Sequence, residues 1–144
     1  MNQRKVIIRT DASTREGEGC GVAFKSKIYL TNNMMEYESS DFVEKNLKTT
    51  DAETFAVLFA LKEMKQYLKE NGMTIANYSV EIESDCDDTV NRVRGIKEGN
   101  DIDKFINHYL TFYHDVKARW IPRSANTHVD AMAKSIFTRM VDEQ

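Results

Sequence analysis

Short apolar runs separated by glycine-rich and polar turns fill the first third of the chain, and this pattern predicts strands. The run Val6-Ile7-Ile8 lies in a predicted buried strand over residues 5–11. A glycine-rich turn at residues 17–21 leads into a hairpin partner at residues 22–30, and a third strand with weaker alternation follows at residues 35–43. The N-terminal part is therefore predicted to form three antiparallel strands.

From residue 51 onward, apolar positions recur three and four residues apart, which is the period of a helix with one packed face. The last helix is the clearest, with one face made of Val129, Met132, Ala133, Ile136, Phe137 and Met140. In chain order we predict a helix over 51–70, a strand over 78–84, a helix from 87 through Ile96 that Gly99-Asn100 ends, a helix over 102–113, a strand over 116–121 and the last helix over 129–140. This order predicts an α/β fold with helices packed on a mixed sheet.

Composition narrows the class of protein. A chain of 144 residues, 41% hydrophobic and 30% charged, is expected to form a single domain over residues 1–144. The apolar runs are shorter than the roughly 20 residues of a membrane helix. Cys20 and Cys86 show neither disulfide nor zinc-site spacing, so we expect a reduced cytoplasmic protein. We also expect a monomer with no membrane partner and no obligatory protein partner. The net charge of −3 counts against nucleic-acid binding, unless bound cations cancel part of it.

Four acidic residues stand where predicted strands end or predicted helices begin: Asp11, Glu53, Asp85 and Asp130. Carboxylates collected from such positions can meet in one place, where they repel one another unless cations neutralise them. Carboxylate oxygens are the ligands that Mg²⁺ prefers, and divalent metals assist phosphodiester chemistry. A divalent metal site is therefore the first hypothesis.

Three of these acids also have purely structural interpretations. Glu53 completes a Thr50-x-x-Glu53 capping-box pattern, and Asp130 stands in a first helical turn, where an acid offsets the helix dipole. Asp85 is close to Asp87 and Asp88, one of which is expected to be an N-cap. Asp11 has no local capping role, so it is the strongest functional candidate of the four.

With this element order, five short stretches of the chain resemble the type I ribonuclease H family, in the branch with a short loop before the final helix. The stretches are Ile8-Arg9-Thr10-Asp11-Ala12-Ser13, Gly19-Cys20-Gly21-Val22-Ala23-Phe24, Asp51-Ala52-Glu53-Thr54-Phe55-Ala56, Ile82-Glu83-Ser84-Asp85-Cys86 and Trp120-Ile121-Pro122-Arg123-Ser124-Ala125-Asn126-Thr127-His128-Val129-Asp130-Ala131-Met132-Ala133-Lys134. One such stretch is a weak signal, but five in the right order are specific. The resemblance covers nearly the whole chain.

The resemblance implies a ribonuclease H-like fold: a five-stranded mixed sheet of three antiparallel N-terminal strands and two further parallel strands, with helices on both faces. It also implies an endonuclease that hydrolyses the RNA strand of RNA–DNA hybrids. In such enzymes the four acids hold two Mg²⁺ ions, with Mn²⁺ as a substitute. Carried over, Asp11 would bridge both ions, Asp130 would complete one site, and Glu53 with Asp85 the other.

Further residues are weaker candidates. The resemblance implies substrate-binding roles for Ser13, Thr50, Arg123 and Asn126, and His128 is a candidate proton shuttle near the acids. Each also has a structural alternative: Arg123 and His128 as solvated surface residues, and Asn126 as a residue that positions the loop or caps the helix. Protein groups that read 2′-hydroxyls would select the ribose strand.

Some features depart from the family pattern. Thr31-Asn32-Asn33 precedes Glu36 as it precedes the catalytic glutamate in some members, but no helical stripe follows Glu36, so Glu53 is preferred. The basic helix that grips the hybrid in some members is reduced here to Arg92-Val93-Arg94. Two alternatives therefore stay open: a nuclease of the same fold that acts on branched DNA or duplex RNA, and a binding module without catalysis.

Overall fold

The computed structural model describes residues 4–95 and 100–142. In these ranges the strands are β1 (Lys5–Thr14), β2 (Cys20–Tyr29), β3 (Met34–Val43), β4 (Ser79–Ser84) and β5 (Asp115–Trp120). The α-helices are α1 (Thr49–Glu70), α2 (Asp87–Val93), α3 (Asp101–Leu110) and α4 (Thr127–Val141), and two short 3-10 helices are η1 (Ile75–Asn77) and η2 (Arg123–Ala125). This order confirms the predicted succession of strands and helices. None of the helices in the described ranges is long and apolar enough to cross a membrane.

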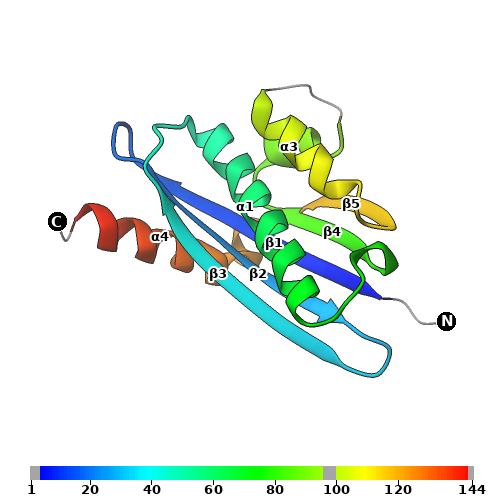
Figure 1. Cartoon of the computed structure of the whole chain (residues 1–144). Helices are drawn as coiled ribbons and strands as arrows, with labels where there is room; N and C mark the ends of the chain where they lie inside the picture. The colour runs from blue at the N-terminus through cyan, green and yellow to red at the C-terminus, as the bar shows by residue number, and fades with distance from the viewer. Residues whose placement is uncertain (1–3, 96–99, 143–144) are drawn as a thin grey trace.

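The strands form one mixed sheet in the order β3-β2-β1-β4-β5. β1 pairs antiparallel with β2, and β2 pairs antiparallel with β3. β4 is parallel to β1 and to β5. Figure 1 shows α1 and α3 over one face of the sheet and α4 against the other. The predicted five-stranded mixed sheet with helices on both faces is therefore confirmed.

The two faces of the sheet follow from the alternation of side chains along each strand. Val6 and Ile8 of β1 belong to the main core, with Leu61 and Met64 of α1. Ala23 of β2 lies in a separate small cluster with residues of α4. The amphipathic helices thus bury both faces of the central strands.

Gly21 lets α4 approach β2 closely. A Cβ atom at this position would lie only 2.4 Å from the backbone oxygen of Ala133 and 2.9 Å from the side chain of Ile136. A larger residue would therefore push α4 away from the sheet. Because α4 also carries Asp130, this contact bears on the candidate site.

Several predicted boundaries were wrong; the helix predicted over 102–113, for example, ends at Leu110. The predicted helix through Ile96 ends at Val93, because Gly95 takes a left-handed conformation (φ 75°) and its backbone N–H bonds the carbonyl of Arg92. Ile96 and Gly99 themselves lie outside the described residues. The predicted strand 5–11 continues to Thr14, because β2 goes on pairing with β1 there.

Candidate metal centre

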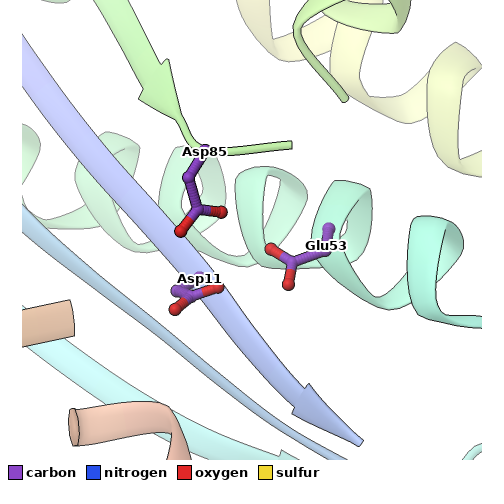
Figure 2. A group of neighbouring side chains, drawn as sticks. All are labelled: Asp11, Glu53 and Asp85. Carbon is purple, nitrogen blue, oxygen red and sulfur yellow. The ribbon is translucent and has the colours of Figure 1, made fainter. Parts of the chain in front are cut away.

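Three carboxylates from three different elements converge at one end of the sheet. Asp11 comes from β1, Glu53 from the second turn of α1, and Asp85 from the residue directly after β4. One oxygen from each lies within 4.8 Å of the others, and Figure 2 shows the three side chains pointing toward one another. Three of the four predicted metal ligands are therefore brought together.

The parallel pairing of β1 with β4 explains why two of these acids meet. Its last paired residues are Arg9 and Glu83, and each chain reaches its aspartate two residues later. Beyond this point β1 still pairs with β2, whereas β4 ends at Ser84. The space between the two diverging chains is where Asp11 and Asp85 face Glu53.

The carboxylates are held in a poorly solvated, negatively charged environment. Asp11 is 4% exposed and Glu53 is 9% exposed. Burial, and then the charge of Asp85, raise the pKa of Asp11 to about 7. Burial, and then the proximity of Asp11, raise the pKa of Glu53 to about 10. Without a cation, the folded protein therefore binds protons here at neutral pH.

Two further details fit a divalent cation. Glu53 Oε2 is buried and has no hydrogen-bond partner among the described residues. Asp11 Oδ1 accepts a hydrogen bond of 2.9 Å from the backbone N–H of Ala12, which orients its carboxylate. A buried carboxylate oxygen without a donor is a costly arrangement that a bound cation would relieve.

Asp130, the fourth predicted ligand, lies outside this compact group. It stands in the first turn of α4, and an interaction between its side chain and that of Asp11 contributes to the raised pKa of Asp11. Its carboxylate also forms an ion pair of 3.0 Å with Lys134. Asp130 is thus beside Asp11 but partly neutralised, and its role as a ligand stays a prediction.

The two capping roles considered for the acids were wrong. The capping box at Glu53 was wrong, since α1 begins at Thr49 after Lys48 and has no side-chain cap, so Thr50 lies inside the helix. The expected aspartate cap of α2 was also wrong, because Cys86 is at the N-cap position. The rejected candidate Glu36 is exposed on β3, 3.8 Å from Lys25.

Asn126 ties the start of α4 to β1. Its Nδ2 donates a hydrogen bond of 2.9 Å to the carbonyl of Thr10, the residue before Asp11, and the residue is 1% exposed. Arg9 supports the same loop by donating from its Nη1 to the carbonyl of Ala125 at 2.7 Å. The hydrogen bond to Thr10 fits the role of positioning the loop that was predicted for Asn126. The side chain of Asn126 makes no capping hydrogen bond to α4.

The other predicted residues lie on β1, α1, η2 and α4. Ser13 is half-buried on β1, and Thr50 is exposed in the first turn of α1. Arg123 is exposed at the start of η2. His128 is exposed, and its Nε2 lies 3.1 Å from the carboxylate of Glu38 on β3. Their functional roles stay predictions.

Two residues near the group were missed by the sequence reasoning. Trp120 is 48% exposed, and its Nε1 donates to the carbonyl of Asp85 at 3.2 Å. Arg92 is buried instead of facing solvent as part of a basic helix. No local pattern marks its burial, because its partners Asp51 and Asp103 are 41 and 11 residues away in the chain.

Comparisons with known proteins identify the family of the chain and solved structures with a similar fold. The family model described as reverse transcriptase-like matches residues 9–136. None of the curated proteins compared with the chain matches it.

Solved structures of similar fold share little sequence with this chain. RNase H1 from the halophilic archaeon Halobacterium salinarum NRC-1 has a TM-score of 0.68 and 20% identity, covering 92% of this chain and 96% of that one. LC11-RNase H1, isolated from compost by a metagenomic approach, was solved in complex with RNA/DNA hybrid and has a TM-score of 0.72 and 19% identity, covering 93% and 97%. The N-terminal RNase H domain of Rv2228c from Mycobacterium tuberculosis has a TM-score of 0.67 and 15% identity, covering 96% of each chain.

Proposed function

The chain belongs to the reverse transcriptase-like family and has a ribonuclease H-like fold, and from this we propose that it is a metal-dependent endonuclease that hydrolyses the RNA strand of RNA–DNA hybrids. The observation that carries the proposal is the group formed by Asp11, Glu53 and Asp85, with an unpartnered buried oxygen on Glu53. Folding alone does not favour such a cluster, because each acid is made costly by its neighbours.

The chain's own residues would prepare the site for cations. We propose that Asp11 contacts both of two ions, that Glu53 and Asp85 hold one, and that Asp130 completes the other. Hard carboxylate oxygens favour Mg²⁺, with Mn²⁺ as a substitute. When bound, the ions would supply positive charge at the scissile phosphate and lower the pKa of a water.

The raised pKa values make this binding dependent on pH. Asp11 and Glu53 must lose their protons before they can bind a cation, so cation binding competes with protonation. Affinity is therefore expected to rise as the pH rises through 7. This trend would be absent if the cation were held by fully solvated acids.

Support for the hybrid as substrate comes from the similarity in fold to LC11-RNase H1, whose structure holds an RNA/DNA hybrid. We propose that Ser13, Thr50 and Arg123 contact the nucleic acid, because each is solvent-accessible and the family resemblance implies this role. The arginines of the reduced basic segment make contacts within the protein. Arg92 is buried, and Arg94 donates twice to the carbonyl of Ala118.

A second candidate is that the same site cleaves a different duplex, since the basic segment that grips the hybrid in some family members is reduced here. A single assay separates the two. End-labelled RNA–DNA hybrid, duplex RNA, duplex DNA and branched DNA are incubated with the protein in Mg²⁺, in Mn²⁺ or in EDTA. Cleavage of only the RNA strand of the hybrid, lost in EDTA, is the expected result. Cleavage of another substrate would support the second candidate, and no cleavage with either ion would contradict the proposal and favour a binding module.

A further inference from the structure

Glu53 is the member of the carboxylate trio that lies neither on a strand nor directly after one; it reaches the sheet through α1, where Ala52 and Ala56 pack on β2. The paired strands β1 and β4 set Asp11 relative to Asp85. Glu53 lies on α1, whose apolar packing on the sheet is not directional. The separation between Glu53 and Asp85 therefore depends on what holds the first turns of α1 against α2, the helix that begins two residues after Asp85.

A buried hydroxyl pair makes one such link. Thr54 Oγ1 of α1 and Thr89 Oγ1 of α2 are 2.9 Å apart, and both residues are 0% exposed. Thr54 directly follows Glu53, and its hydroxyl donates to the carbonyl of Thr50 at 2.8 Å. Since a hydroxyl has one proton, Thr89 is then the donor and Thr54 the acceptor of the bond between the helices.

Arg92 makes a second and larger link. Its guanidinium donates to Asp51 Oδ1 in the first turn of α1 at 2.9 Å and to Asp103 Oδ1 in the first turn of α3 at 2.8 Å. It also donates to Asn100 Oδ1 at 3.0 Å. The side chain is only 4% exposed, and a buried guanidinium of this kind requires all its partners in place. Arg92 therefore joins the N-terminal turns of α1 and α3 to α2.

We propose that Thr89 and Arg92 are positioning residues that set the distance between the Glu53 and Asp85 carboxylates and thereby the affinity of the site for divalent cations. This inference rests on the proposed metal-dependent function. Neither side chain touches the cation or the substrate. Each acts through the first turns of α1, which carry Glu53.

The first test uses Thr89→Val, which keeps the shape of the side chain and replaces its hydroxyl by a methyl group. Cation binding is measured by titration calorimetry with Mn²⁺ and by the rise in melting temperature that Mn²⁺ produces, and the melting temperature is also measured in EDTA. Thr89→Val is expected to weaken Mn²⁺ binding roughly ten- to hundredfold, as is usual when a group that orients a metal ligand is lost. Thr89→Ser, which restores the hydroxyl, is expected to bind like the wild type.

Thr111→Val is the matched control. Thr111 is also a helix-associated threonine with one local bond, from its Oγ1 to the carbonyl of His108 at 2.6 Å, but it lies at the end of α3 and is exposed. Its loss is expected to leave Mn²⁺ affinity unchanged. Equal Mn²⁺ affinity in Thr89→Val and the wild type would overturn the inference.

Arg92→Lys provides the second test, because lysine keeps the charge but cannot reproduce the fork of the guanidinium. Cleavage by Thr89→Val and by Arg92→Lys is expected to recover at high Mn²⁺, because a higher concentration of the cation fills a site of lower affinity. Lower activity at every Mn²⁺ concentration with unchanged affinity would overturn the inference. If Arg92→Lys does not unfold cooperatively, the Thr89 series decides alone. A wild-type protein without any Mn²⁺ response would instead refute the proposed function itself, and this inference with it.

Discussion

Asp11→Asn tests the crowding of the carboxylates through stability as well as activity. In the folded protein without metal, burial and the charge of Asp85 raise the pKa of Asp11 from 3.8 to about 7. Ionising this carboxyl therefore costs the folded state about 4 kcal/mol more than the unfolded state, as an upper limit. Asparagine removes the charge, and its Oδ1 can still accept the bond from the N–H of Ala12.

The sign of the pH dependence follows from the direction of the shift. Between pH 4 and 7 the folded state holds a proton on Asp11 that the unfolded state has lost, so wild-type stability falls across this window as pH rises. The stability of Asp11→Asn does not fall in this way, because asparagine does not titrate. Because part of the cost is relieved by relaxation, we expect Asp11→Asn to exceed the wild type by about 1–2 kcal/mol at pH 8 in EDTA. That gain corresponds to a melting temperature roughly 3–6 °C higher.

The assay is thermal unfolding in EDTA at pH 4, 6 and 8, with hybrid cleavage in Mg²⁺ measured on the same samples. Asp41→Asn is the matched control, because Asp41 Oδ1 accepts from the next backbone N–H in the same way at 2.8 Å but is exposed on β3. The gain in stability should be confined to Asp11→Asn and should vanish at pH 4. Cleavage by this variant should fall at least roughly hundredfold. Reduced metal-free stability at pH 8, or a gain that does not change with pH, would refute the crowding argument.

Three further changes test other parts of the site. Glu53→Gln should raise the metal-free stability at pH 7 and should raise it by a smaller amount at pH 4, because burial and Asp11 raise the pKa of Glu53 to about 10. The same variant should abolish the rise in melting temperature that Mn²⁺ produces. Asn126→Ala should cost about 1–3 kcal/mol in denaturant unfolding, since it leaves the carbonyl of Thr10 without its donor, and an unchanged midpoint would contradict that role. Gly21→Ala should cost about 1–3 kcal/mol by pushing α4 from β2, and full stability with full cleavage would show that this close approach is dispensable.

The sequence by itself determined the elements and their order. The six-position apolar stripe beginning at Val129 and the helical spacing after Ala52 predicted α4 and α1, because the period of a helix depends only on residues a few positions apart. Resemblance in five ordered stretches then indicated the sheet topology and the acids. The sequence also favoured Glu53 over Glu36, and in the structure Glu36 is an exposed residue of β3.

Only the tertiary structure decided how those residues meet. The gathering of Asp11, Glu53 and Asp85, with Asp130 beside them and paired with Lys134, depends on where the parallel ladder ends and on how α1 and α4 pack. The burial of Arg92 was not visible either, because its partners are 41 and 11 residues away in the chain. Periodicity reports the local environment of a segment, whereas the distance between charged groups on different segments is set by packing that no local pattern encodes.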